Sequence, residues 1–340
     1  MSAELNELRD SARAVLSGAG VAADEASTWP SLVELGWLMV STPEEFGGLG
    51  QGLAGACAIY TEMGRALATA PYISAMLSLD AIQNSTRSDR DAWLERLMAG
   101  EYVAAPLADA QLKVTDGSVS GAMHAVPSAD TATHFLVLTD ARIALMPRDA
   151  AGVAFTERQT WDQTRRLFDV SFDKAKPSPD LILAEGAAAA SLAERIRAHR
   201  DFALAADAVG GAASILDITV EYLKTRSQYG RPLAMFQALK HRCADLKAAA
   251  TAAEALLASS LDRVDGDTDV KALALLGKKA KHFACVTYAA VTEESVQLHG
   301  GIGMTSEHPC HLYLKRALLN QHLGRDANYE AEIAASALRT

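Results

Sequence analysis

The spacing of apolar residues changes twice along the 340-residue chain, and these changes restrict its possible folds most strongly. Up to about residue 100 the apolar residues recur every three or four positions, as they do in amphipathic helices. From about Tyr102 to Pro179 they alternate, or form short runs between turn-forming residues, which is typical of strands. Helical spacing returns from Leu181 onward, in long segments. The pattern predicts a mainly α protein with a small β domain between two helical parts.

We therefore expect three domains with boundaries near residues 101 and 180. Residues 1–101 would form an N-terminal helical domain, and residues 102–180 a middle antiparallel β sandwich or barrel. Residues 181–340 would form a C-terminal four-helix bundle. The strands are expected at 134–139, 142–147, 153–157 and 167–173, and the bundle helices at 187–226, 237–262, 270–298 and 307–323.

Composition excludes several classes of partner. The chain carries 32 basic and 42 acidic side chains, a formal net charge of −10, and no basic block. This charge argues against nucleic acid or an anionic membrane surface as the main partner. No uncharged apolar run approaches the ~20 residues of a membrane span. Four isolated cysteines without a CxxC pair indicate buried thiols in a reducing compartment, so we expect a cytoplasmic protein with no metal site. These cysteines are Cys57, Cys243, Cys285 and Cys310.

One informative motif runs from Arg226 to Gln237, with the sequence RSQYGRPLAMFQ. Part of the motif has an ordinary explanation, because a helix that ends before Gly230 and Pro232 is followed by a turn that leads to the next bundle helix. The motif also places the donor groups of Arg226 and Gln237 beside aromatic side chains. This combination suits a phosphate or a planar heterocycle.

A second motif, QLHGGIGMTSEHP, begins at Gln297 and contains Gly300 and Gly301. The glycines end a helix and allow the backbone to approach another group closely. Alone the pattern is weak, because it lacks the preceding strand of a dinucleotide-binding fingerprint.

Taken together and in this order, the two motifs resemble hallmark sequences of the acyl-CoA dehydrogenase family, RxQFGxxxxxFQ and QxxGGxGxxxExP. The resemblance extends to LGWLMVSTPEEFGGLG at 35–50, GRALATAP at 64–71 and LDITVEYLKTR at 216–226, so it covers nearly the whole chain. The phrase EHPCHLYLKRA at 307–317 is similar to the short subunit of bacterial members that work as unlike-subunit α2β2 pairs.

The resemblance implies the fold described above, with a dimer formed through the C-terminal bundle and an FAD that crosses the interface. The two motifs of one subunit would contact the adenine and pyrophosphate of the neighbour's flavin. The residues implied are Arg226, Gln228, Tyr229, Phe236, Gln237, Gln297, Gly300 and Gly301.

The catalytic base of the family has no evident counterpart. The reaction needs a carboxylate near the α-carbon of the thioester. An ungapped count places one usual base position at Gly324 and the other, ten residues before Gly210, at Arg200. Arginine stays protonated and cannot act as a base. Asp201 is a weak candidate, since it and Asp207 should each face a different side of the helix from Arg200.

The middle domain also departs from the family pattern. In members of the family, two stretches of this domain hold the isoalloxazine ring. The corresponding stretches here are AAPLADAQLK at 104–113 and GAMHAVPSAD at 121–130. Neither stretch offers the expected Thr or Ser donors, or a tryptophan. We expect the domain to fold but to hold no flavin ring of its own.

These departures favour a base-lacking subunit that completes the FAD site of a homologous catalytic partner. The resemblance implies α,β-desaturation of an acyl-CoA, with a steroid side chain as one candidate substrate and an electron-transfer flavoprotein as the electron acceptor. One alternative is a self-sufficient homo-oligomer with a displaced base, at Asp201 or Glu330. Another is a relative without redox activity that acts as a binding or scaffold protein.

Overall fold

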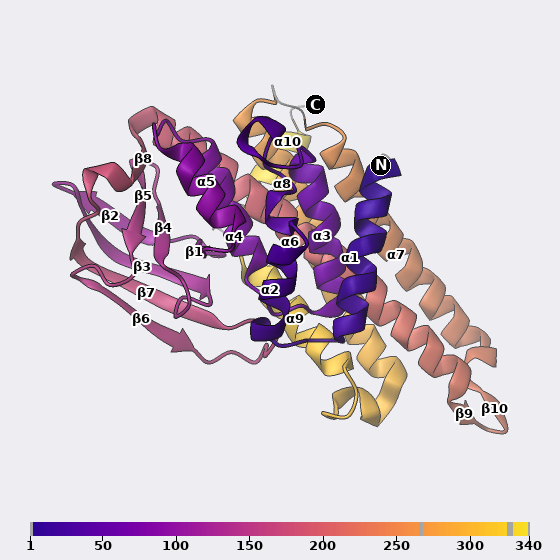
Figure 1. Cartoon of the computed structure of the whole chain (residues 1–340). Helices are drawn as coiled ribbons and strands as arrows, with labels where there is room; N and C mark the ends of the chain where they lie inside the picture. Colours follow the sequence, from indigo (N-terminus) through magenta and orange to yellow (C-terminus); the bar gives the residue numbers. More distant parts are fainter. Residues whose placement is uncertain (1–2, 265–267, 325–328, 339–340) are drawn as a thin grey trace.

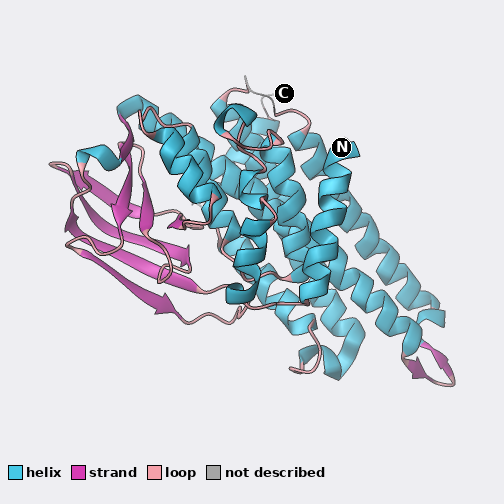
Figure 2. Ribbon diagram, viewed as in Figure 1, coloured by secondary structure: helices cyan, strands magenta, loops and turns pink. Residues whose placement is uncertain are grey.

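A computed structural model describes residues 3–264, 268–324 and 329–338. Two sheets lie at one end of the molecule, the helices pack against them, and a small hairpin projects at the opposite end (Figure 1). The order of helices, strands and helices follows the expected change of periodicity (Figure 2). The N-terminal helices are α1 (Ala3–Ala19), α2 (Glu25–Glu34), α3 (Gly52–Ala66), α4 (Tyr72–Gln83) and α5 (Arg90–Met98).

The middle part consists of two four-stranded sheets, with strand orders β1-β4-β5-β8 and β2-β3-β7-β6. All pairs are antiparallel except β1 with β4, which is parallel. The last strand, β8, pairs with β5 and leads directly into the first bundle helix. The strands are β1 (Val103–Ala104), β2 (Gln111–Thr115), β3 (Ser118–Pro127), β4 (His134–Leu138), β5 (Arg142–Pro147), β6 (Val153–Arg158), β7 (Leu167–Ala175) and β8 (Ile182–Glu185).

The C-terminal part contains the long helices of the expected bundle, followed by a short additional helix, α10. The helices are α6 (Gly186–Thr225), α7 (Gln237–Leu261), α8 (Val270–His299), α9 (Cys310–His322) and α10 (Tyr329–Ala337). By length and composition α6 could cross a membrane, but 72% of its most apolar window is buried inside the fold. Burial of this kind is typical of the central helix of a folded domain.

Glycines let the central helix α6 lie very close to α3. A Cβ on Gly210 would overlap the backbone carbonyl oxygen of Thr61, and one on Gly64 would overlap that of Asp207. Gly210 and its neighbour Gly211, which interrupt the apolar pattern of the sequence, lie inside a continuous helix. Their role is close packing rather than a break in the helix.

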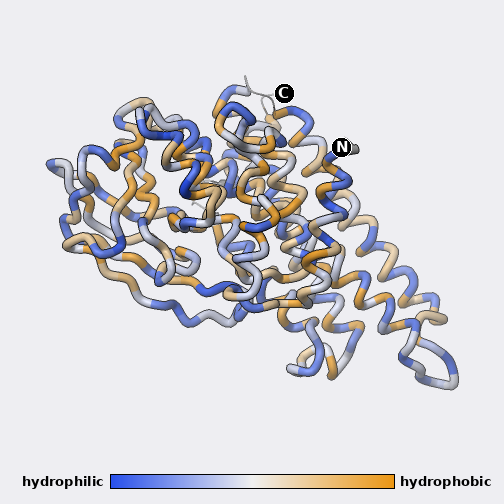
Figure 3. Tube along the Cα trace, in the orientation of Figure 1, coloured by the Kyte–Doolittle hydropathy of each residue, from blue (hydrophilic) through white to orange (hydrophobic). Residues whose placement is uncertain are grey.

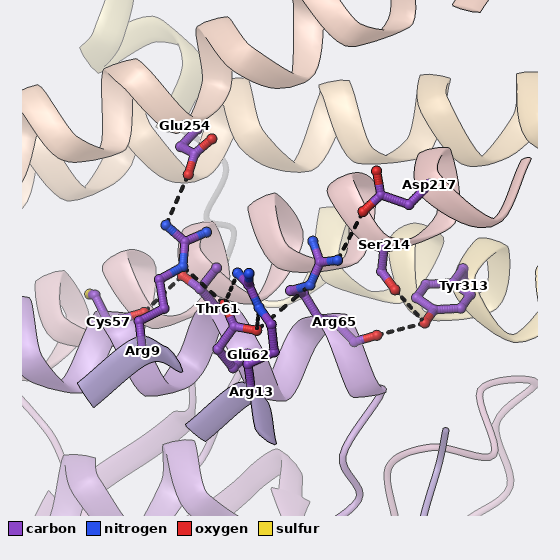
Figure 4. Close-up of polar contacts among 10 residues, drawn as sticks. All are labelled: Arg9, Arg13, Cys57, Thr61, Glu62, Arg65, Ser214, Asp217, Glu254 and Tyr313. Atoms are coloured by element: carbon purple, nitrogen blue, oxygen red, sulfur yellow. Dashed lines mark hydrogen bonds and ion pairs between the residues drawn. The ribbon is translucent and has the colours of Figure 1, made fainter. Parts of the chain in front are cut away.

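The N-terminal helix α1 is attached to α3 by a buried carboxylate (Figure 4). Glu62, 1% exposed, accepts hydrogen bonds from Arg9 at 2.9 Å and from Arg13 at 2.8 and 2.9 Å. Arg65 lies 3.6 Å from the same carboxylate, and Arg9 also reaches Glu254 of α7. Burial alone would raise the pKa of Glu62, but Arg13 and Arg9 lower it. The cluster therefore joins three helices through charge-assisted hydrogen bonds.

The close packing of α3 and α6 predicts a strong effect of a single methyl group. Gly210→Ala should lower the free energy of unfolding by about 3 kcal/mol, because the helices must move apart. Gly18→Ala is the matched control, since a Cβ there meets no atom within 4 Å, and it should change stability by less than about 1 kcal/mol. Chemical denaturation of both variants measures the difference, and equal midpoints would contradict the prediction.

Candidate functional site

The first motif forms a hairpin that begins where α6 ends. Strands β9 (Ser227–Gln228) and β10 (Arg231–Pro232) pair antiparallel around a two-residue turn. The turn residues Tyr229 and Gly230 have φ values of 51° and 76°, as a primed hairpin turn requires. Tyr229 is 91% exposed, and in Figure 3 the hairpin is mostly hydrophilic. The hairpin therefore presents its side chains to the surroundings rather than to this chain's core.

The second motif ends α8 and continues as a short 3-10 segment, Gly300–Met304. We call this segment the flavin-facing loop, after the role that the resemblance implies for it. Gly300 caps the helix with φ 64° and ψ −144°. A Cβ added at Gly300 or Gly301 would meet no atom within 4 Å. Gly301 has no positive φ, so neither backbone strain nor this chain's own packing explains why it is glycine. The free space permits another molecule to approach the backbone.

One contact places the two motifs at the same end of the bundle. Tyr222, one turn before the end of α6, donates a hydrogen bond to the carbonyl oxygen of His299 at 3.2 Å. Its ring also stacks on the His299 ring, with centroids 4.5 Å apart. The flavin-facing loop begins directly after His299, and the hairpin begins at Ser227, shortly after Tyr222.

The polar groups of the two motifs are available for a ligand. Among the described residues, no side chain forms a hydrogen bond or ion pair with the side chain of Arg226, Gln228 or Gln297. The side chain of Gln237 forms one hydrogen bond within the described part of the chain, with His241, at 3.2 Å between their Nε2 atoms. A guanidinium group, side-chain amides, an exposed aromatic ring and an open glycine backbone fit the adenine and pyrophosphate half of FAD.

The two stretches that the resemblance assigns to the flavin ring border two cavities of very different size. Asp109, from the first stretch, borders a cavity of about 470 Å³, whose lining includes charged side chains of α6 and α8. A largely apolar isoalloxazine ring placed there would remove these charges from water without pairing them. Leu107 and Pro127, one from each stretch, border a much smaller cavity of about 20 Å³.

A buried ionic cluster, the Asp207 cluster, borders the same cavity. It consists of Asp207 on α6, Arg316 and Asn320 on α9, and Arg165 on the segment between β6 and β7. The carboxylate of Asp207 lies 2.5 Å from Arg316, 3.1 Å from Arg165 and 2.7 Å from Asn320. Arg165 also donates to Asn320. Burial alone would raise the pKa of Asp207, but the two guanidinium groups overcome this effect and lower it to about 2.

Removal of this carboxylate should destabilise the protein strongly. Asp207→Asn leaves two guanidinium groups buried, so the free energy of unfolding should fall by about 3–5 kcal/mol. Asp217→Asn on the same helix is the control, because the Asp217 side chain is 65% exposed and its ion pair with Arg65 lies at the surface. The control should lose less than about 1 kcal/mol.

The same carboxylate should also contribute to acid unfolding. A lowered pKa in the folded state means that its contribution is present above pH 4 and is lost as the pH falls toward 2. Denaturation curves between pH 7 and 2 should therefore converge for the wild type and Asp207→Asn. A constant difference across this range would contradict the assignment.

The two positions expected for a base lie in contact, but they hold no base. Arg200 is buried and donates to the carbonyl oxygen of Gly324 at 3.1 Å and to Asp109 at 2.7 Å. A Cβ on Gly324 would lie only 2.8 Å from Arg200 Nε and from Asp201 Oδ1. The backbone of Gly324 in turn donates to the carbonyl oxygen of Leu107. Arg200 thus fills the space beside Gly324, where the resemblance predicts a carboxylate.

The structure corrects one expectation about Asp201. This residue does not face away from Arg200, because both border a cavity of about 470 Å³, and Asp201 Oδ1 lies 3.5 Å from Arg200 Nε. Burial raises the pKa of Asp201 to about 6, and Arg200 opposes the shift. Asp207 does lie elsewhere, in its own cluster. Glu330, on the first turn of α10, does not border this cavity, whereas Glu332 does.

Sequence reasoning missed the residues that close the site. Arg165, Arg316 and Asn320 belong to no motif. Asp109 lies in the stretch 104–113, in which the missing Thr and Ser donors were the only feature noted. The ungapped count to Gly324 and Arg200 was the one signal that pointed to this region. In the described part of the chain no group of His, Cys, Asp or Glu is arranged to hold a metal ion. The four cysteines are free thiols.

Family models match both helical parts of the chain. The N-terminal domain model of acyl-CoA dehydrogenase matches residues 2–101, and the C-terminal domain model matches residues 191–338. The chain belongs to the acyl-CoA dehydrogenase family. This membership places it among oxidoreductases and implies FAD as the family cofactor.

Named relatives support the same family. The chain is 34% identical, over 295 residues, to the acyl-CoA dehydrogenase IpdE2 of Mycobacterium tuberculosis (strain ATCC 25618 / H37Rv), covering 86% of this chain and 80% of the relative. A solved structure described as a Tcur3481-Tcur3483 steroid ACAD G363A variant is similar, with TM-score 0.85 and 27% identity over 99% of both chains. The ChsE4-ChsE5 complex from Mycobacterium tuberculosis shares the fold, with TM-score 0.84, 22% identity, and 100% and 98% coverage.

Asp201 provides a test between a displaced base and none. Asp201→Asn should leave the turnover per bound flavin unchanged within about twofold in an active complex. If Asp201 were the base, turnover would fall by about 10²–10⁴. Single-turnover flavin bleaching by an acyl-CoA substrate measures this rate without interference from the amount of folded protein.

Proposed function

We propose that this chain is the non-catalytic subunit of a heteromeric α2β2 acyl-CoA dehydrogenase, in which it completes the FAD site of a homologous catalytic subunit. The observation that carries the proposal is an asymmetry. The residues for the adenine and pyrophosphate half of the cofactor are exposed and open. In the same chain the base positions hold an arginine and a glycine, and the region assigned to the flavin ring contains buried ion pairs and a cavity lined by charged side chains.

The chemistry of the open half is complementary to a dinucleotide held by another subunit. Arg226 would offset the charge of the pyrophosphate, and the backbone at Gly301 would approach it without steric conflict. Gln228, Gln237 and Gln297 would supply neutral donors and acceptors. FAD, when bound, accepts a hydride from the β-carbon of the acyl-CoA. The base that removes the α-proton would come from the partner.

A stripe along α8 supports docking of the partner on the same face. Exposed residues recur at helical spacing and lead to the flavin-facing loop: Phe283, Val286, Ala290, Glu293 and Gln297. Phe283 and Val286 are 40% and 48% exposed, and Met304 beyond the loop is 65% exposed. Large apolar side chains exposed in a continuous row are typical of a protein interface. A homologous bundle is the occupant that the family membership favours.

The substrate class that we propose is an acyl-CoA with a bulky steroid-derived acyl group, because one of the similar solved structures is a steroid ACAD variant. Electrons would leave the complex through an electron-transfer flavoprotein. Free thiols and the absence of any basic block support a cytoplasmic protein without a nucleic acid or membrane partner.

Flavin content tests the division of roles directly. Purified alone, the chain should show no absorbance at 450 nm, and co-expression with a homologous catalytic subunit should give a yellow complex with one FAD per pair. One FAD per copy of this chain alone would overturn the proposal and favour the self-sufficient enzyme. A stable complex without flavin would favour the scaffold alternative.

A substitution at Gly301 sharpens this test. Gly301→Val should leave the thermal stability of the isolated chain unchanged, because a Cβ there meets no atom of this chain. In the complex the added side chain should lower FAD affinity at least tenfold, with Gly301→Ala intermediate, by blocking the approach to the backbone. Fluorescence titration of the apo complex with FAD measures the affinity. Equal affinity of all three proteins would exclude contact with the flavin at this loop.

A further inference from the structure

Three aromatic rings pack beside the flavin-facing loop. The centroid of the His299 ring lies 4.5 Å from that of Tyr222 and 4.3 Å from that of His308, and the Tyr222 and His308 rings also contact each other edge-on, at 6.3 Å. We call these three rings the stack. His299 is the residue directly before Gly300, and His308 precedes α9, so the two histidines bracket the loop. The stack therefore fixes both ends of the loop against the last turn of α6.

Backbone contacts specify a neutral form of His299. Its Nδ1 lies 2.7 Å from the carbonyl oxygen of Ser295, so this nitrogen carries the proton. The Nε2 atom is then an unprotonated acceptor, and it is buried without a hydrogen-bond partner among the described residues. A proton at Nε2 would place a charged donor where no acceptor is available.

A different backbone contact specifies a neutral form of His308. Its Nδ1 accepts a hydrogen bond from the backbone N–H of Cys310 at 3.3 Å, at the start of α9. Protonation of Nδ1 would turn the acceptor into a donor and break this contact. The positive end of the helix dipole also disfavours a cation at this place.

The surroundings offer no compensation for a positive charge. Among the described residues, the groups that face the two imidazoles are Tyr222 from α6, and Cys310 and His311 from α9. Lys315, also on α9, acts on His311. No carboxylate forms an ion pair with either ring in the ranges that the structure describes. Burial lowers the pKa of His299, and burial together with His299 and His311 lowers that of His308.

We propose that His299 and His308 are positioning residues that hold the flavin-facing loop in shape only while both imidazoles are neutral. The loop should therefore open on mild acidification, and FAD should be released from the assembled complex. The role in FAD binding rests on the function proposed above, whereas the effect on the loop is a property of this chain alone.

The direction of the effect follows from proton linkage. Both histidines bind protons more readily when the stack is open than when it is closed. The contribution of the stack is thus complete above about pH 7 and decreases as the pH falls through 6.5, the ordinary value for histidine. Each ring can change the opening equilibrium by up to about tenfold per pH unit below that value.

Hydrogen exchange of the isolated full chain tests the loop itself. After correction for the intrinsic rate, exchange of amides 300–310 should accelerate at least tenfold between pH 7.5 and 5.5. His308→Asn keeps an acceptor for the Cys310 N–H, so it should retain protection at pH 7.5 and show a weaker pH response. His308→Ala should lose protection at both values. The control His134→Asn, in β4 of the sheets, should behave like the wild type.

The complex with a homologous catalytic subunit provides the second measurement. The Kd for FAD should rise at least tenfold between pH 7.5 and 5.5, and this rise should shrink in His308→Asn. Amide exchange that is independent of pH would overturn the inference, whatever the complex does. A pH-sensitive loop in a complex that binds no FAD would instead overturn the proposed function and leave the positioning of the loop intact.

Discussion

The buried carboxylate of Asp207 is the interaction on which the arrangement of domains depends. It joins α6, α9 and the segment between two strands of the middle sheets through Arg316, Arg165 and Asn320. Ion pairs of this kind add little net stability relative to an apolar core, but they penalise any arrangement that leaves a charge unpaired. The cluster therefore fixes one relative position of the sheets and the bundle. The contacts of Arg200 with Asp109 and Gly324 act in the same way near the start of α6.

This closed region and the open end of the bundle differ in their relation to a cofactor. At the closed region the chain pairs its own buried charges, and the cavity beside Asp109 and Arg200 has a charged lining. At the open end a guanidinium group, amides and two glycines have no counterpart within the described chain. A protein that bound a whole flavin by itself would need both regions open. The proposed division of roles between two homologous subunits accounts for the asymmetry with no additional assumption.

Periodicity was sufficient to predict much of the fold. The strands at 134–138, 142–147, 153–158 and 167–175 agree with the expected segments to within two residues at either end. The first two are short buried runs, and the last alternates between buried and exposed residues over part of its length. The parallel pair β1–β4 was not predictable, since β1 has only two residues. The packing role of Gly210 was also missed, because a glycine within a helical pattern indicates a weak point in the helix as readily as close packing against another helix.

For the candidate site, the motifs identified Arg226, Gln297 and Gly301, whose exposure follows from hairpin and helix-end geometry. The residues that close the ring site were beyond sequence reasoning. Arg165 and Asp207, or Arg200 and Asp109, are far apart in the chain and form pairs only after the domains pack. A single sequence carries no signal for such pairs. The orientation of Asp201 relative to Arg200 was predicted incorrectly. Helical rotation turns adjacent side chains by about 100°, but both can still border one cavity.

The closed ring site has a consequence for assembly in the cell. Many flavoproteins gain stability from their cofactor, because a ligand that binds only the folded state shifts the folding equilibrium. Under the proposed division of roles this chain would gain nothing from free FAD, so its folding would be independent of the flavin supply. Such a subunit would accumulate as a finished protein during riboflavin shortage, and only the partner would then limit the amount of active enzyme.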